Sequence, residues 1–394
     1  MDLGPEFRLF CLTLRRPQTA DDLREMRRLA AATEHWDFIV RGARRHRVGA
    51  LVLGGLQACN SPDMPAGVLA ALRRLSVASA RRNLVQGAEV GRLYRLLTEA
   101  GVRVLVLKGI ALSVQLYGEP VRRDARDIDL LVDPAELARA AAVLTHAGYR
   151  RGQNAASPRQ AAAYLRWIKE FEFFHEDTGG MVELHHRLTD NPSLLSFDFP
   201  SLWNEREEVR LFGDTVVATV PRQRLPLYLC VHGGDHGWAR LHWLVDFSAA
   251  LSQAQEMATL VETADACGLR WSFLHALLLA HDWLGLPAEE NLLARLRRSG
   301  KIRRREWLMR RLYSPKTWYY AAPKGSWSRA VRYSLWERLY RFSLKSDWRY
   351  RASQLRREWF SPADRDAVPL PDALSWLYPL LRPWGWLIRR LSLF

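Results

Sequence analysis

Two aspartates, two residues apart, are the first candidates for chemistry in this sequence. Asp127 and Asp129 stand in the segment RDARDIDLLV, whose apolar end predicts a β-strand over about residues 128–132. Side chains at positions i and i+2 of a strand point to the same face of a sheet, so both carboxylates would lie together. Two neighbouring negative charges favour a bound cation, and Mg²⁺ is commonly held by one or two carboxylates plus substrate phosphates.

A third carboxylate, Glu183, lies in a later predicted strand with the sequence MVELHHRL. Apolar residues alternate there with Glu183 and His185, so these two side chains share the polar face of the strand. Three carboxylates around two metal ions are a set suited to phosphoryl or nucleotidyl transfer. We therefore predict that Asp127, Asp129 and Glu183 are catalytic residues that bind two Mg²⁺ ions. His185 would orient Glu183 or assist proton transfer, although a single histidine on a strand is more often structural.

A lysine and a glycine directly follow an earlier predicted strand, the apolar run at 102–107. Gly109 permits close approach of the backbone to a phosphate, and Lys108 supplies a positive charge. An isolated Asp-x-Asp pair is more often a solvated strand edge or a helix entry. The order of a strand, Lys-Gly, Asp-x-Asp and a third acid on another strand gives each part a use, and it favours a catalytic site.

These motifs resemble the polymerase-beta-like nucleotidyltransferase superfamily, whose pattern is a Gly-containing turn, then Asp-x-Asp/Glu, then a third acid on a later strand. More narrowly, the chain is similar to the bacterial "uncharacterised nucleotidyltransferase" family, which is often found in natural-product gene clusters. The similar stretches are VLVLKGIALSVQLYGEPVRRDARDIDLLVDP, VELHHRL and LCVHGGDHGWARLHWLVDFS. The resemblance extends over almost the entire chain.

The resemblance implies that the three acids bind the metal and that Lys108 and Gly109 replace the superfamily's more usual Gly-Ser turn. Arg123 keeps a basic position associated with the family and is included among the nucleotide-binding candidates. The chain also departs from the superfamily pattern, because Ile110 follows the glycine and seventeen residues separate Gly109 from Asp127. Phosphate binding is therefore expected to differ in detail.

Two histidines and an aspartate in VHGGDHGWARLHWLVDF form a further group of candidates: His232, His236 and Asp246. On a helix, His232 and His236 at i and i+4 share a face, and such a pair can bind zinc. The segment lacks the glutamate of an HExxH motif, which disfavours zinc. Two roles stay open: a hydrogen-bonded core cluster, or a wall over the nucleotide in which these residues contact phosphate, ribose or acceptor.

The hypothesised reaction is attack by an acceptor hydroxyl or phosphate on the α-phosphorus of a nucleoside triphosphate, with ATP expected, releasing pyrophosphate. The acceptor would be a small molecule or a modified natural-product peptide, and nucleic acid is not favoured. An enzymatic alternative is kinase-like transfer of the γ-phosphoryl group at the same metal site. A rival from another class is a non-catalytic protein that binds nucleotide, peptide or nucleic acid through its basic helices.

The elements that must position these residues predict an α+β fold, a small mixed β-sheet core flanked by helices. Helical periodicity covers the chain from about residue 20 to 100, where Thr19 and Asp22 have the spacing of a capping box. Strands are predicted at about 102–107, 128–132, 170–176 and 181–188, and the turn at 177–180 has hairpin chemistry. The expected divisions are a helical N-terminal region (1–100), a nucleotidyltransferase core (101–222) and a helical C-terminal domain with an aromatic-rich tail (223–394).

Composition excludes several classes of protein. The 394 residues carry a net charge of +16, which suits anionic partners. No apolar run is long enough to span a membrane, and the four cysteines are scattered without metal-site spacing, so we expect a cytoplasmic protein with reduced thiols. The tail over 372–394 combines aromatic residues with three arginines; docking on its own domain is favoured, with contact to an anionic membrane surface as the alternative.

Overall fold

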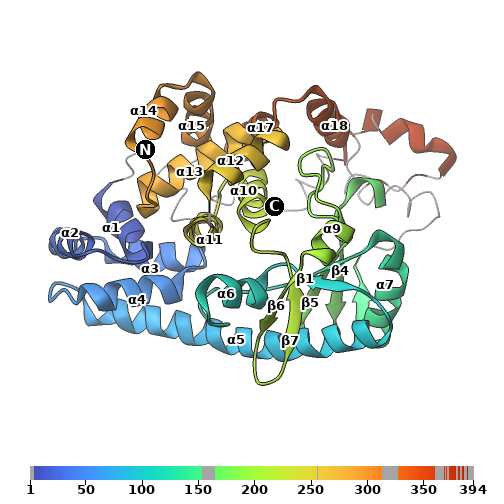
Figure 1. Cartoon of the computed structure of the whole chain (residues 1–394), viewed down its shortest axis with the longest axis horizontal. Helices are drawn as coiled ribbons and strands as arrows, with labels where there is room; N and C mark the ends of the chain where they lie inside the picture. The colour runs from blue at the N-terminus through green and yellow to red at the C-terminus, as the bar shows by residue number, and fades with distance from the viewer. Residues whose placement is uncertain are drawn as a thin grey trace.

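The computed structural model describes residues 4–152, 165–254, 256–312 and 327–359, together with scattered positions between 368 and 388. It is an α+β fold, as predicted, in which a seven-stranded mixed sheet lies among helices from both ends of the chain (Figure 1). Part of the predicted tail at 372–394, including its last six residues, lies outside the described residues. Within the described part, no helix combines the length and the apolar character needed to cross a membrane.

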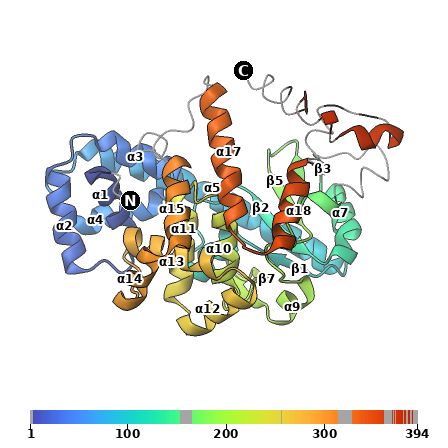
Figure 2. The same ribbon diagram turned by 90° about the horizontal axis from the view of Figure 1, so that it is seen from above.

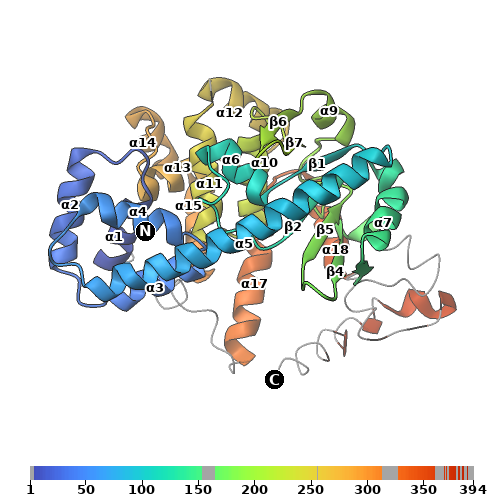
Figure 3. The same cartoon turned by 90° about the horizontal axis from the view of Figure 1, so that it is seen from below.

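Five helices of the described chain precede the sheet, and the last of them holds the loop that leads into strand β2 (Ile128–Val132). They are α1 (Pro5–Leu14), α2 (Ala20–Ala31), α3 (Trp36–Arg45), α4 (Gly49–Cys59) and α5 (Ala66–Glu99). The predicted capping box is present, because the Thr19 hydroxyl accepts from the Asp22 amide and the Asp22 carboxylate accepts from the Thr19 amide. Helix α5 has 34 residues and crosses the whole molecule, passing under both the N-terminal helices and the sheet (Figure 3).

The sheet has the strand order β3-β4-β5-β2-β1-β7-β6. Its strands are β1 (Val104–Val106), β2 (Ile128–Val132), β3 (Tyr149–Arg151), β4 (Glu170–His175), β5 (Met181–His185), β6 (Glu207–Arg210) and β7 (Val216–Thr219). The four predicted strands are confirmed as β1, β2, β4 and β5. The prediction missed β3, β6 and β7, which have three or four residues each; β3 and β6 form the two edges and are rich in charge rather than apolar residues.

The two faces of the sheet have different partners. Apolar side chains such as Leu130 and Leu184 face α5 and α7 (Leu137–His146), where they form one buried cluster. Because side chains alternate along a strand, Asp129, Glu183 and His185 point to the opposite face. That face lies toward the helices of the C-terminal half, so the acids sit between the sheet and those helices.

The remaining helices pack on this second face and on the N-terminal helices. They are α9 (Phe199–Asn204), α10 (Leu225–Asp235), α11 (Leu241–Ser252), α12 (Met257–Ala266), α13 (Arg270–Leu284), α14 (Glu290–Arg298), α15 (Gly300–Leu312), α17 (Trp327–Ser343) and α18 (Trp348–Trp359). Viewed from above, α10, α11 and α13 lie between the N-terminal helices and the strands (Figure 2). The largest apolar core contains both Phe10 of α1 and Phe273 of α13, so it joins residues from distant parts of the chain.

Candidate active site

The register of three strands brings acidic residues side by side. Strands β2 and β5 are parallel neighbours, and their register pairs Asp129 with Glu183. Strands β5 and β4 are antiparallel, and their register pairs His185 with Glu170 and Glu183 with Glu172. Since paired residues on adjacent strands lie about 5 Å apart, the side chains on this face meet.

His185 lies at the centre of the resulting cluster. Its Nε2 is 3.2 Å from Oδ1 of Asp129, 3.1 Å from Oε2 of Glu170 and 3.4 Å from Oε2 of Glu183. One potential ligand atom from each of Asp129, Glu183 and His185 lies within 4.8 Å of the other two. In the described part of the chain, this is the one place where three or more side chains that can bind a metal ion come together.

Burial and charge set the protonation of the cluster. The side chains of Asp129 and His185 are each 1% exposed, whereas Glu183 is 16% and Glu170 22% exposed. Burial and the charges of Asp129 and Glu170 raise the pKa of Glu183. Burial opposes protonation of His185, but the Glu170 charge and the contacts with Asp129 and Glu183 outweigh it and raise the pKa of His185. A protonated His185 therefore offsets part of the crowded negative charge.

Lys108 joins the cluster from the end of β1, as the residue before α6 (Gly109–Tyr117). Its Nζ lies 2.7 Å from Oδ1 of Asp129, and its side chain is 10% exposed. Burial alone would lower the pKa of Lys108, yet the Asp129 carboxylate and the other acids raise it above its ordinary value. The same ammonium, with His185, holds the pKa of Asp129 well below its ordinary value despite burial.

Gly109 gives the chain the sharp turn between β1 and α6. Its φ of 62° lies in the left-handed region that favours glycine. A Cβ at this position would stand 3.5 Å from the carbonyl oxygen of Asp127 and 3.7 Å from the Cβ of Ala125, so the loop before β2 covers the turn. The predicted phosphate-binding role of Lys108 and Gly109 stays a prediction, because here the lysine binds Asp129 and the glycine is buried.

Asp127 lies one residue before β2 and outside the three-residue group. Its side chain is partly exposed and forms no hydrogen bond or ion pair with the described residues. Several positive charges lie near it, because the Asp127 carboxylate acts to raise the pKa values of Arg47, Arg240 and Lys108. The carboxylate is thus free to bind a ligand, and its role as a metal ligand beside Asp129 stays a prediction.

Comparison with known families places the chain that carries this acidic cluster. A family model described as "Uncharacterised nucleotidyltransferase" matches residues 32–285, more than half of the chain. The chain belongs to this nucleotidyltransferase family. The matched range contains the whole acidic cluster and the helices α10 and α11 that cover it. No curated protein matches the sequence.

In this nucleotidyltransferase, the loop from Gly118 to Asp127 is fixed by Asn83, a fully buried residue of α5. The Asn83 side-chain amide donates to the carbonyl oxygens of Pro120 (2.8 Å) and Arg123 (2.6 Å), and its oxygen accepts from the Ala125 amide (3.2 Å). Three hydrogen bonds to one loop leave its backbone little freedom. Asn83 therefore sets the entry of the chain into β2 and the position of Asp127.

Arg123 and Asp246, both predicted to be nucleotide-binding candidates, bind each other. Arg123 Nε donates to Oδ2 of Asp246 at 2.8 Å, and the Tyr117 hydroxyl donates to Oδ1 at 2.7 Å. The two charged side chains are 8% and 2% exposed. This buried pair joins the loop before β2 to α6 and α11, which favours the hydrogen-bonded core role over direct contact with a nucleotide.

Asp246→Asn is expected to lower the free energy of unfolding by about 3 kcal/mol, because it leaves the buried Arg123 guanidinium without a counter-charge. The amide oxygen can still accept from Tyr117, which keeps the loss at the low end of the range for a broken buried pair. Urea denaturation followed by circular dichroism measures the change, with the surface variant Asp265→Asn as control. A loss below about 0.5 kcal/mol would contradict a stabilising role for the buried Arg123–Asp246 pair.

The histidines of α10 form an aromatic wall beside the acids. His232 and His236 have ring centroids 4.9 Å apart, and Trp243 of α11 stacks on His236 at 4.7 Å. Burial and the positive charges of Lys108 and Lys169 hold the pKa of His232 well below its ordinary value, so it is neutral. Within the described residues, the two histidines belong to no metal-ligating group, and their role toward a nucleotide stays a prediction.

Sequence reasoning missed three residues of this candidate site: Glu170, Lys169 and Tyr228. Glu170 binds His185, and Lys169 forms an ion pair with Glu170. Tyr228 is buried on α10, one turn before His232, and its hydroxyl titration depends on Lys108 and the acids. The signal for Glu170 was present, because KEFEFF alternates acidic and aromatic residues as the neighbouring strand does.

Proposed function

We propose that this nucleotidyltransferase is polymerase-beta-like and transfers a nucleoside monophosphate from a nucleoside triphosphate, with ATP expected, to an acceptor hydroxyl or phosphate. The observation that carries the proposal is the pairing of Asp129 with Glu183 on neighbouring strands, beside a further aspartate at the strand entry. Acids that converge from separate segments on one polar sheet face are what metal-dependent nucleotidyl transfer requires. Membership of the family supports the same reaction.

The residues present fit a divalent cation. Asp129 and Glu183 offer oxygen atoms close enough to share one ion, and oxygen is the ligand type that Mg²⁺ prefers. Burial and the charges of Asp129 and Glu170 raise the pKa of Glu183, and a cation at this point would offset that negative charge. Asp127, Asp129 and Glu183 would hold two Mg²⁺ ions, and protonated His185 would orient Asp129 and Glu183 through its Nε2. Bound Mg²⁺ supplies positive charge that neutralises the triphosphate and the departing pyrophosphate.

The reaction forms a bond between the acceptor oxygen and the α-phosphorus. The bond from the α-phosphorus to the oxygen that bridges to the β-phosphate breaks, and pyrophosphate leaves with the bonding electrons. A hydroxyl acceptor loses its proton to the carboxylate of Glu183, whose raised pKa makes it a better base than Asp129, whose pKa is lowered. His232 and Tyr228 face the acids from α10 and would border the nucleotide.

The proposal is tested with ATP labelled on either the α- or the γ-phosphate. The purified chain is incubated with Mg²⁺, labelled ATP and a cell extract of small molecules and peptides, and products are separated by chromatography and weighed by mass spectrometry. We expect label from the α-phosphate in a product, equimolar pyrophosphate, and no reaction in EDTA. Label from the γ-phosphate in the product would instead establish a kinase. ATP binding that needs no metal and gives no product would indicate a non-catalytic binding protein.

A further inference from the structure

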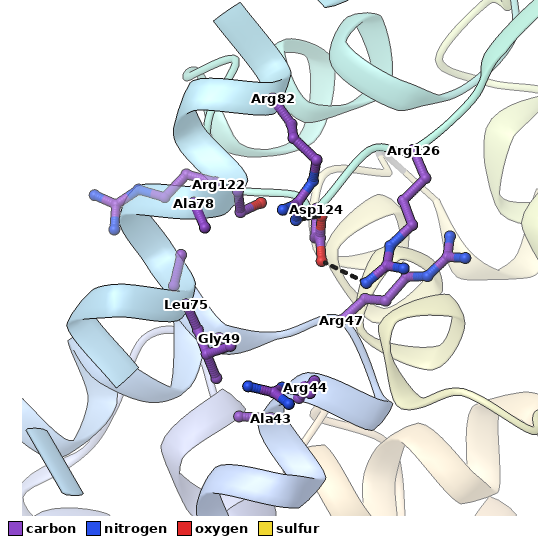
Figure 4. A pocket seen from close by; sticks show the side chains of 12 residues that line it. Ala43, Arg44, Arg47, Gly49, Leu75, Ala78, Arg82, Arg122, Asp124 and Arg126 are labelled. Carbon is purple, nitrogen blue, oxygen red and sulfur yellow. Dashed lines mark hydrogen bonds and ion pairs between the residues drawn. The ribbon is translucent and has the colours of Figure 1, made fainter. Parts of the chain in front are cut away.

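A pocket lined by arginines lies beside the loop that leads to Asp127. Its volume is about 270 Å³, and it is bordered by the end of α3, the start of α4, the middle of α5 and the loop before β2 (Figure 4). Five of its lining residues are arginines: Arg44, Arg47, Arg82, Arg122 and Arg126. Asp124 is the acid among the described residues that line it. The pocket is smaller than typical sites for whole drug-sized ligands, and its charge suits a compact anion.

The positive charge of the pocket is only partly neutralised. Asp124 binds Arg82 at 2.7 Å and Arg126 more loosely at 3.8 Å, the two interactions drawn in Figure 4. Arg122 pairs with Glu119, which lies outside the pocket lining. The side chains of Arg44 and Arg47 form no hydrogen bond or ion pair with the described part of the chain. At least two guanidinium groups are therefore available to an anion.

Two uncharged groups add donors to the same space. Ser79 of α5 is 6% exposed and lines the pocket, yet its hydroxyl has no partner among the described residues. Gly49 and Ala50, the first residues of α4, also line it, and no side chain caps this helix start. The amide groups of a first helical turn carry partial positive charge and favour bound phosphate. Neutral donors and guanidinium groups thus share one cavity.

Arg47 links the pocket to the candidate active site. Burial and the charge of Arg240 lower the pKa of Arg47 to about 10, while Asp127 acts in the opposite direction. Arg47 also has a φ of 56°, a left-handed conformation that favours glycine. The chain therefore keeps a partly buried arginine, with little counter-charge, at a position where glycine would fit the backbone better. A bound anion would supply the missing charge.

We propose that this pocket binds the phosphate groups of a substrate whose reacting atom lies at the acidic cluster, an inference that rests on the proposed function. Lys108 and Gly109 present no free charge, because the lysine binds Asp129 and the loop before β2 covers the glycine. The arginines present free charge on the Asp127 side of the cluster. Planar guanidinium groups bind phosphate oxygens in pairs, so a short phosphate chain matches the pocket.

Calorimetry with inorganic tripolyphosphate in metal-free buffer tests the proposal on the full chain. We expect the wild-type protein to bind it, with affinity that falls as salt rises. Arg44→Gln and Arg47→Gly should each weaken binding roughly ten- to a hundredfold, the loss expected for a charge-assisted hydrogen bond. Glycine suits the backbone at position 47, so Arg47→Gly should fold normally. The matched control is Arg210→Gln, on the surface of β6, which should bind tripolyphosphate as the wild-type protein does. Wild-type affinity in Arg44→Gln and Arg47→Gly as well would overturn the proposal.

Competition with ATP identifies the source of the phosphate. If the pocket holds the triphosphate tail, ATP displaces bound tripolyphosphate and AMP does not. If the pocket holds a phosphorylated acceptor, tripolyphosphate and ATP bind together. Activity separates this proposal from the proposed function. If the wild-type protein binds tripolyphosphate but transfers no nucleotide, the pocket proposal stands and the proposed function fails. If the KM values are unchanged in Arg44→Gln and Arg47→Gly, the proposed function stands and the pocket proposal fails.

Discussion

Asp129→Asn is expected to abolish nucleotide transfer and to destabilise the protein by about 3–5 kcal/mol. The carboxylate is 1% exposed and forms the ion pair with Lys108 at 2.7 Å. Removing one partner of a buried pair leaves the other charge in the protein interior without compensation, which accounts for the stability loss. The lost metal ligand removes several kcal/mol of charge stabilisation in the transition state, and about 4 kcal/mol corresponds to about a thousandfold in rate.

The double variant Asp129→Asn/Lys108→Met separates these two effects. It removes both charges and keeps side chains of similar size, and such a replacement of a buried ion pair is often close to neutral for stability. We expect urea denaturation to show most of the lost stability restored, while transfer from α-labelled ATP stays absent. A double variant as unstable as the single one would show that Lys108 is not the cause. Transfer within tenfold of wild type in either variant would contradict the catalytic role of Asp129.

The sequence predicts the four strands that carry or border the site because each contains a run of apolar or alternating residues. It does not predict which strands are neighbours. The acids at 129 and 183 meet because β5 pairs in parallel with β2, while β4 and β3 extend the sheet beyond β5. Strand order depends on packing between distant segments, which local periodicity does not record. The short edge strands β3 and β6 gave no signal because they contain few apolar residues and several charged ones.

Contacts between distant segments also explain why the sequence did not predict the partners that some site residues have in the structure. Lys108 and Arg123 are cations near motifs, and positive charge alone suggests contact with phosphate. In the structure, Lys108 binds Asp129 and Arg123 binds Asp246, so both cations are neutralised inside the protein. Their partners lie 21 and 123 residues away in the sequence, and no spacing rule connects them. The arginines with free guanidinium groups, Arg44 and Arg47, come instead from α3 and the turn that follows it, before the sheet.

Asp127→Asn is expected to reduce transfer by about a thousandfold and to leave the stability of the fold unchanged within about 0.5 kcal/mol. Asp127 lies one residue before β2 and is proposed to bind the same metal ions as Asp129, so the loss of its charge removes a ligand. Unlike Asp129, it is partly exposed and makes no hydrogen bond or ion pair with the described residues. No buried charge is left unpaired by the substitution.

The neighbouring arginines could give Asp127→Asn a small loss of stability in addition to the loss of activity. Arg47 and Arg240 lose a nearby negative charge in Asp127→Asn, which increases their mutual repulsion. Both arginines are partly exposed, and water and salt screen such repulsion, so a small loss of stability should disappear as the salt concentration rises. Denaturation at low and high salt, beside the surface control Asp214→Asn, measures this. A loss of stability at every salt concentration would show that Asp127 is a structural residue. Replacing a partly exposed carboxylate that only binds a ligand should reduce activity and leave stability unchanged.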